Sequence, residues 1–433
     1  MARASRWALF DGLYIPPDRM TDALTGRLLV LLSDRSVRMS IAALRRAAGP
    51  RTRVATTLDV RSGFLTPEQA EGADAVFFDR LGVALVNVAP GDAGRTARLR
   101  SAAADNAARI LAVEPERYVH AYGLVRRPAK PAPRARRSPA GARAPSGSEA
   151  QVTWGLQATG VPSSAFSGKG VKVAVLDTGF DLTHPDFPSR SVTAVSFVKG
   201  YSAQDGHGHG THCIGTACGP ESPYHPPRYG VAFGSAILSG KVLDDNGGGA
   251  DGGILAGINW AVTQGARVVS MSLGAEVTVT DPFSEVFEAV GQRALAAGTL
   301  VVAAAGNESD RGDGWFAPVG HPANCPSILA VGALDSRMQL GNFSNRGLSP
   351  NGGQVDVAAP GVDVLSAFPM PIRSRRLSGT SMATPHVAGL AALWAEAHPK
   401  ATATELWTLL TQHARRLPLL STDVGAGLAL APE

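Results

Sequence analysis

The feature that most constrains the fold is a series of short, almost uncharged apolar runs after residue 150. These runs are rich in Val and Ala: Val171–Leu176, Ala236–Val242, Arg267–Ser272, Thr299–Ala304 and Ile328–Val331. Continuous apolar strands that alternate with helices are typical of a parallel sheet buried on both faces. We therefore predict an α/β domain over residues 151–433, with helices over Gly252–Gln264, Pro282–Ala297 and Met382–Ala395.

Polar residues stand where three of these runs end. Asp177 follows the first run, Ser272 ends the third, and Asn307 comes shortly after the fourth. In sheets of this kind, ligands bind at the carboxyl ends of the strands. The pattern therefore predicts a site at one edge of the sheet.

Residues 24–122 form a separate, smaller unit. Strand patterns and helix patterns follow one another in the order β-α-β-β-α-β: Arg27–Leu32, Met39–Ala48, Ala75–Phe78, Val83–Val88, Arg95–Leu111 and Tyr118–Ala121. This order is that of a ferredoxin-like α+β domain. Residues 1–23 would be an N-terminal extension to it.

Residues 123–150 have the composition of a linker. They hold five prolines and most of the basic excess of the protein, and they offer little apolar surface for a core. The formal net charge is +5, but residues outside 121–150 carry 34 basic against 35 acidic side chains, or −1. Because the folded part is nearly neutral, neither nucleic-acid binding nor membrane binding is expected.

Three cysteines, Cys213, Cys218 and Cys325, are too few for a disulfide framework. Cys213 and Cys218 are expected to share a helix, which would hold their Cα atoms roughly 8–9 Å apart, beyond disulfide reach. No apolar run approaches the roughly 18 residues of a membrane span. Charged residues interrupt the N-terminal region before 28–32, so no signal peptide is visible and the localisation stays open.

Four short motifs carry the groups that amide hydrolysis by serine requires. Ser381 stands in a turn of small residues as a nucleophile, and the Gly-flanked His209 is a base. Asp177 would orient that base, and Asn307 would offer an amide donor to a developing oxyanion. Taken singly, these residues could have a purely structural role: Ser381 could be a helix cap, and Asp177 or Asn307 could be a turn residue. His207 and His212 are rivals for the role of base.

Residues 151–415 resemble the catalytic domain of the subtilisin-like serine proteases, the subtilases. The resemblance is carried by four segments that occur in the family's order: Val173–Gly179, His209–Cys213, Ala303–Asn307 and Gly379–His386. It implies the family's three-layer fold and a serine endopeptidase that works through an acyl-enzyme. Asp177, His209 and Ser381 would be the triad, with Asn307 in the oxyanion hole and no cofactor required for catalysis.

The same resemblance implies how a polypeptide substrate binds. Two extended segments would pair with the substrate backbone from either side: Ser272, Leu273 and Gly274, and Gly247, Gly248 and Gly249. The pocket for the residue before the scissile bond would be lined by Ala304, Ala305 and Gly306, with Glu308 near its rim and Gly320 near its base. These small residues favour a large apolar side chain.

Residues 24–122 resemble the inhibitory propeptide of this family, through their strand order and the ending Tyr118–Tyr122. This implies a zymogen in which the propeptide inhibits its own peptidase and is cut after Tyr122. An unrelated accessory domain is the alternative.

Two features depart from or vary the family pattern. Asp186 matches one ligand of a structural calcium, but residues 220–228 lack the expected ligand loop, which argues against calcium there. Cys213 lies in the His209 segment, where it is expected to pack under the histidine without acting as a nucleophile.

The sequence therefore predicts a monomeric serine endopeptidase made as an autoprocessed zymogen. Two alternatives remain: a non-catalytic peptide-binding protein on the same fold, and a protease dedicated to one precursor.

Overall fold

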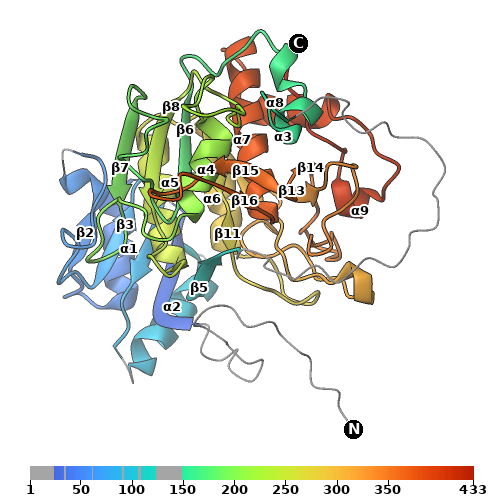
Figure 1. Ribbon diagram of the computed structural model, residues 1–433. Helices are drawn as coiled ribbons and strands as arrows, with labels where there is room; N and C mark the ends of the chain where they lie inside the picture. The colour runs from blue at the N-terminus through green and yellow to red at the C-terminus, as the bar shows by residue number, and fades with distance from the viewer. Residues whose placement is uncertain (1–23, 34–35, 61, 90–91, 106–108, 123–148) are drawn as a thin grey trace.

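The computed structural model describes residues 24–33, 36–60, 62–89, 92–105, 109–122 and 149–433. The expected N-terminal extension, 1–23, and nearly all of the expected linker lie outside these residues. The described residues form a larger unit, 149–433, and a smaller unit, 24–122, that packs against it (Figure 1).

The larger unit is built on a seven-stranded sheet in which all neighbouring strands are parallel. In spatial order the strands are β14 (Val357–Pro360), β13 (Leu329–Leu334), β12 (Leu300–Ala304), β10 (Val268–Met271), β6 (Lys172–Asp177), β8 (Ala236–Lys241) and β7 (Val192–Ser196). All five predicted apolar runs are strands of this sheet. The two strands that the sequence did not indicate, β7 and β14, lie at its edges.

Helices cover both faces of the sheet. On one face lie α4 (His209–Cys218) and α7 (Thr380–Ala397), and on the other α5 (Asp251–Thr263) and α6 (Glu285–Ala296). Burial on both faces explains why the run that forms β6 is apolar throughout. Val173 and Val175 belong to the core with α4 and α7, while Ala174 and Leu176 belong to the core with α5 and α6. This three-layer arrangement confirms the predicted α/β class.

Shorter elements complete the larger unit: α3 (Trp154–Ala158), β9 (Gly248–Ala250), β11 (Leu273–Gly274), the β15–β16 hairpin (Val364–Ala367 and Ser374–Leu377), α8 (Ala403–Gln412) and α9 (Ser421–Val424). Within the described ranges, no helix has both the length and the apolar character needed to cross a membrane.

The smaller unit contains β1 (Leu24–Leu32), α1 (Val37–Ala48), β2 (Val54–Thr56), β3 (Ala75–Phe78), β4 (Val83–Val86), α2 (Ala93–Ala104) and β5 (Ile110–Ala121). Its sheet has the order β5-β1-β4-β3, antiparallel throughout, with β2 added in parallel at the edge of β3. Without β2, the elements follow the order β-α-β-β-α-β.

The predicted helix over Arg95–Leu111 was wrong at its end. Helix α2 ends at Ala104, and β5 begins at Ile110. Ile110 and Ala112 are buried while Leu111 is 54% exposed, which is the alternation of a strand. Pairing of this segment with β1 overrides the local helical pattern.

The sheet of the smaller unit is apolar on both faces because each face is covered. Leu28 and Val30 of β1 pack in the core that contains α1, whereas Leu29 and Leu31 pack in the core that contains α5 and α6. Helices α5 and α6 therefore lie between the two sheets. Removing the smaller unit would expose apolar surface on both partners.

Two glutamates of β5 bind the N-terminal ends of these same helices. Glu116 accepts a hydrogen bond from Gly252 N (2.9 Å), in the first turn of α5. Glu114 accepts hydrogen bonds from Glu285 N (2.7 Å) and from Ser284, the N-cap of α6. A carboxylate satisfies the free N–H groups there and interacts favourably with the helix dipole. The contacts fix β5 across the ends of both helices.

Candidate active site

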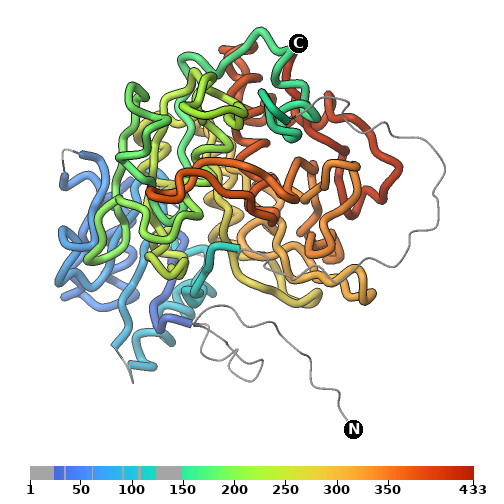
Figure 2. The backbone as a smooth tube through the Cα atoms, in the orientation of Figure 1, coloured from blue at the N-terminus to red at the C-terminus, as the bar shows by residue number. Residues whose placement is uncertain are grey.

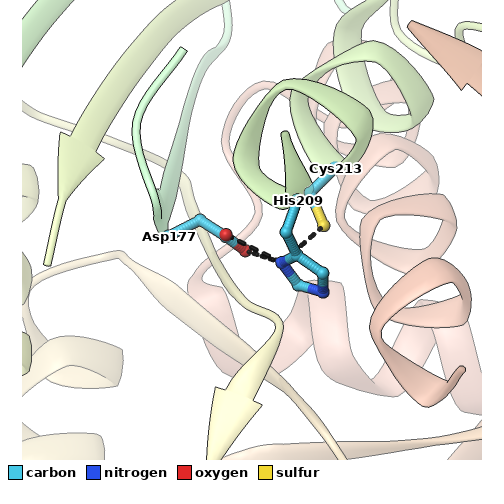
Figure 3. A group of neighbouring side chains, drawn as sticks. All are labelled: Asp177, His209 and Cys213. Carbon is cyan, nitrogen blue, oxygen red and sulfur yellow. Dashed lines mark hydrogen bonds and ion pairs between the residues drawn. The ribbon is translucent and has the colours of Figure 1, made fainter. Parts of the chain in front are cut away.

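A carboxylate and an imidazole meet at the carboxyl edge of the parallel sheet. Asp177 is the last residue of β6, and His209 is the first residue of α4. His209 Nδ1 lies 2.8 Å and 3.0 Å from the two carboxylate oxygens of Asp177 (Figure 3). Burial opposes the charged imidazole, but the charge and hydrogen bond of Asp177 outweigh it and raise the pKa of His209 well above its ordinary value.

Ser381 is buried in the first turn of α7, which begins at Thr380. Its Oγ lies 3.2 Å from the carbonyl oxygen of Tyr122 and 3.1 Å from that of Ser272. His209 Nε2 is buried and has no hydrogen-bond partner among the described residues. The structure thus joins Asp177 to His209, while the hydroxyl of Ser381 is turned toward carbonyl oxygens.

Asn307 presents a free amide donor beside Ser381. Its Oδ1 accepts hydrogen bonds from both N and Oγ1 of Thr380, each at 2.9 Å. This orients the amide and leaves Nδ2 buried without a partner among the described residues. A buried donor without an acceptor is unfavourable, so its position favours an oxygen-bearing ligand. The orienting role of Thr380 was not predicted from the sequence, although this residue precedes Ser381 in the same motif.

The C-terminal strand of the smaller unit lies between the two segments expected to bind substrate. On one side, Val119 pairs with Gly249 and His120 with Gly248. On the other side, the strand pairs with β11 in antiparallel register. Figure 2 shows residues near 120, in teal, between the segments near 250 and near 275. The backbone of β5 therefore makes contacts that an extended peptide would make.

Further hydrogen bonds continue this pairing to the end of the smaller unit. Ala121 N donates to Gly247 O at 2.8 Å, and Tyr122 N donates to Ser272 O at 3.4 Å. Leu273 is the register partner of Ala121. Tyr122 is the last described residue before the gap, and its carbonyl lies at Ser381.

The side chain of Tyr122 occupies a pocket with a glycine floor. A Cβ atom on Gly274 or on Gly320 would come within 2.3 Å of the phenolic oxygen. Gly320 N donates to Ala305 O at 2.9 Å, and this hydrogen bond connects the segment that contains Gly320 to the segment that contains Ala305. Among the other expected pocket residues, Ala304 ends β12 and Gly306 N donates to Thr380 Oγ1 (3.2 Å). Only glycine leaves room for the phenol ring at the two floor positions.

Two acidic side chains influence the pocket electrostatically. Burial raises the pKa of the Tyr122 phenol well above its ordinary value, and the charges of Glu308 and Glu276 raise it further. Burial also raises the pKa of Glu308 to about 7, although Asn345 Nδ2 donates to its Oε2 at 2.5 Å. Glu276 was not singled out from the sequence, because nothing near it in the chain links it to the pocket.

Cys213 lies beneath His209, on the next turn of α4. Its Sγ is 3.9 Å from His209 Nδ1 (Figure 3). The same Sγ is 3.5 Å from Ser381 O. Burial raises the pKa of this thiol, which opposes formation of the nucleophilic thiolate. Cys213 and Cys218 both lie on α4 and are free thiols.

Asp186 does not fit the calcium site that the family resemblance implies. Its carboxylate accepts hydrogen bonds from Tyr229 Oη (2.7 Å) and Tyr224 N (3.0 Å), and Arg373 Nη2 lies 3.3 Å from Oδ1. Calcium requires a shell of oxygen acceptors. Here the carboxylate faces two hydrogen-bond donors and a guanidinium, so these partners, like the sequence of residues 220–228, argue against calcium at Asp186.

We predict that Arg373 provides the positive charge at this position and that chelators leave stability unchanged. Arg373→Gln is expected to lower the free energy of unfolding by about 1.5–3 kcal/mol, because Asp186 is nearly buried and would lose its cation. Thermal unfolding with and without EDTA measures this. Arg376→Gln is the control, since its pairs with Glu149 and Asp363 are more exposed. A marked drop in the melting temperature of wild type with EDTA would contradict the prediction.

The amino-acid sequence of the chain matches a known protein family and several of its members. Residues 168–427 match the family described as "Subtilase family". The chain is 40% identical over 246 residues to Subtilisin of Bacillus pumilus, an alignment that covers 56% of this chain and 83% of that protein. It is 38% identical over 285 residues to Subtilisin BL of Lederbergia lenta, covering 65% and 97% of the two chains.

A third relative, Subtilisin E of Bacillus subtilis, is 39% identical over 246 residues, which are 56% of this chain and 60% of that protein. The matched family region contains Asp177, His209, Asn307 and Ser381, and it makes up more than half of the chain. The chain belongs to the subtilase family and is a serine-type endopeptidase.

Proposed function

We propose that Asp177, His209 and Ser381 form the catalytic triad. One observation carries this proposal: the buried Nε2 of His209 and Nδ2 of Asn307 have no partners among the described residues, while Ser381 Oγ lies 3.2 Å from the carbonyl oxygen of Tyr122. These are the base and the oxyanion donor that attack on that carbonyl requires.

The mechanism assigns a step to each group. Rotation about the Cα–Cβ bond of Ser381 turns Oγ toward His209 Nε2, which takes the proton as Oγ attacks the carbonyl carbon. Asp177 keeps the proton of Nδ1 in place and stabilises the imidazolium. Asn307 Nδ2 and the N–H of Ser381, at the N-terminal end of α7, stabilise the oxyanion. His209 then protonates the leaving amine, and water hydrolyses the acyl-enzyme through the same groups.

We infer that residues 24–122 are an inhibitory propeptide and that the chain cuts itself after Tyr122. The support is the pairing of β5 on both sides within the cleft, together with the Tyr122 carbonyl beside Ser381. An N-terminal sequence that begins at Gly123 after incubation of purified zymogen tests this assignment. A first cut at any other bond would contradict it.

Tyr122→Asp is expected to slow the first cut by at least about 10²-fold. The new carboxylate would enter a buried pocket close to Glu308 and Glu276, where both burial and like charge oppose it. The time course of shortening, followed by intact mass, measures the rate. Tyr118→Asp is the matched control, because Tyr118 lies on β5, which ends just before Tyr122, and its side chain is 46% exposed. Equal rates for the two variants would rule out the assigned processing site.

We also propose a preference for large apolar or aromatic residues before the scissile bond, and that Glu308 makes it pH-dependent. Because burial raises the pKa of Glu308 to about 7, an aromatic side chain in the pocket favours the protonated carboxyl. Binding of Tyr substrates should therefore weaken as the pH rises through 7. A Lys side chain would instead favour the ionised carboxylate.

The measurement is kcat/KM for matched peptides with Tyr or Lys before the scissile bond, between pH 5.5 and 8.5. The Lys/Tyr ratio is expected to rise with pH by about 10-fold in wild type and to be flat in Glu308→Gln. A ratio that keeps its pH dependence in the variant would assign the effect to another group.

A further inference from the structure

Asp205 lies buried between the segment that carries Asp177 and the helix that carries His209. It is 3% exposed, and its carboxylate accepts five hydrogen bonds. Oδ1 accepts hydrogen bonds from Thr178 Oγ1 (2.9 Å), His207 N (3.0 Å) and Gly208 N (2.8 Å). Oδ2 accepts hydrogen bonds from both N (2.9 Å) and Oγ1 (2.7 Å) of Thr211.

These donors come from both sides of the acid–base pair. Thr178 follows Asp177 directly, and its own N–H donates to Asp177 Oδ1 at 2.7 Å. Gly208 is the N-cap of α4 and Thr211 is in its first turn, so the two flank His209. A single carboxylate thus holds the backbone next to the acid and the backbone next to the base.

Close packing makes this link rigid. Thr178 Oγ1 also accepts a hydrogen bond from Gly210 N (2.9 Å). A Cβ atom on Gly210 would lie 2.2 Å from the carbonyl oxygen of Gly179, so the first turn of α4 rests directly on the chain after Asp177. The two segments have little freedom to move apart.

The charge of Asp205 is balanced by this hydrogen bonding. No salt bridge to Asp205 occurs in the described parts of the chain. The N-terminal N–H groups of α4 and its dipole stabilise the anion instead. Lys241, the last residue of β8, lies close to this network, where its Nζ donates to Thr178 O at 2.6 Å. The charge of Asp205 is therefore stabilised only while α4 begins at His209 and directs these N–H groups toward the carboxylate.

We propose that Asp205 is a positioning residue that fixes His209 relative to Asp177 before substrate binds. The proposal rests on the catalytic triad proposed above. Asp205 does not touch the reacting atoms, and its effect passes through Thr178 and the first turn of α4. A displacement of about 1 Å in a catalytic group reduces the rate about 10²-fold, so its loss should be visible in kcat.

Asp205→Asn is the direct test. The side chain keeps its size, but its amide nitrogen would face N–H and O–H donors on one of its two sides. We expect kcat to fall about 10²-fold with KM changed less than about 3-fold, because the substrate-binding segments are not in this network. The low-field proton resonance of the hydrogen bond between His209 and Asp177 should shift or broaden.

Asp181→Asn is the matched control. Asp181 is 2% exposed and lies between β6 and β7, and its carboxylate accepts four hydrogen bonds. Those donors belong to Thr183, Gln204 and Met370, none of which is in α4. Full-length variants are matured with a trace of affinity-tagged wild type, which is then removed. Asp181→Asn should lose stability while its kcat stays within about 3-fold of wild type.

The experiment separates failure of this proposal from failure of the triad. If a fluorophosphonate does not label Ser381 in wild type, the triad itself is wrong. If wild type is labelled but Asp205→Asn keeps its kcat, or Asp181→Asn loses as much, the positioning role is overturned.

Should Asp205→Asn fail to fold, Thr178→Val provides the second test. It has the shape of Thr and removes the hydroxyl that joins both Asp205 and Gly210 N to the acid segment. It should lower kcat about 10-fold, and Thr178→Ser, which restores the hydroxyl, should recover most of it. Equal kcat for the Val and Ser variants would overturn the proposal.

Discussion

The chain carrying Ser381→Ala is expected to remain at its full length of 433 residues and to lose hydrolysis by about 10⁶-fold. That is the scale of loss when subtilisin itself lacks its nucleophile. Without Oγ, no group at this position can attack the Tyr122 carbonyl. The variant should fold normally, because Ser272 Oγ and Cys213 Sγ still donate to the backbone oxygen of residue 381, and only the contacts of the hydroxyl with the carbonyl oxygens of Tyr122 and Ser272 are lost.

Intact mass and N-terminal sequence after incubation at neutral pH, beside wild type, measure this loss. Ser270→Ala is the matched control: Ser270 is a buried serine of β10 whose hydroxyl has no hydrogen-bond partner among the described residues. It should process like wild type. Added active wild type should cut the Ser381→Ala chain. Purified Ser381→Ala that shortens by itself would refute both the nucleophile and self-processing.

Asp177→Asn is expected to lower kcat/KM by about 10⁴-fold while leaving the fold intact. Thr178 N donates to Asp177 Oδ1 at 2.7 Å, and this bond would keep the amide oxygen of the new side chain on that side. The NH₂ group would then face His209 Nδ1. An imidazole that must accept at Nδ1 carries its proton on Nε2, and it cannot take the proton of Ser381.

The pH profile provides a second readout for Asp177→Asn. Because the charge of Asp177 raises the pKa of His209, its removal should move the acid limb of the residual activity to lower pH. Asp245→Asn is the control: its carboxylate is 40% exposed and pairs with Lys241, not with His209. Activity within about 10-fold of wild type in Asp177→Asn would exclude this residue as the acid of the triad.

The strands of the parallel sheet were predictable where the residue pattern is typical of a strand that is buried on both faces. Strand β6 is apolar at consecutive positions because helices cover both faces of the sheet. The edge strand β7 was missed because its residues are only partly buried. The end of α2 was misplaced because pairing between β5 and β1 is a long-range contact.

The candidate site was predictable to the extent that its residues stand in local motifs. Asp177, His209, Asn307 and Ser381 each lie beside glycines at a strand end or a helix start, and the resemblance to one family connects them. The roles of three further residues were missed. Thr380, Asp205 and Glu276 gain their roles from partners in other segments of the chain.

The sequence by itself determined the class of fold, the order of the chemical groups and the absence of a disulfide framework, because these follow from local composition and spacing. Only the tertiary structure decided which donors meet which acceptors. It gave Asp186 an arginine and two hydrogen-bond donors where calcium was considered, and it set Tyr122 on a floor of two distant glycines. Those pairings depend on strand order and helix packing, which join residues that are far apart in the chain, such as 38 positions for Asp186 and Tyr224 and 187 for Asp186 and Arg373, and leave no local pattern.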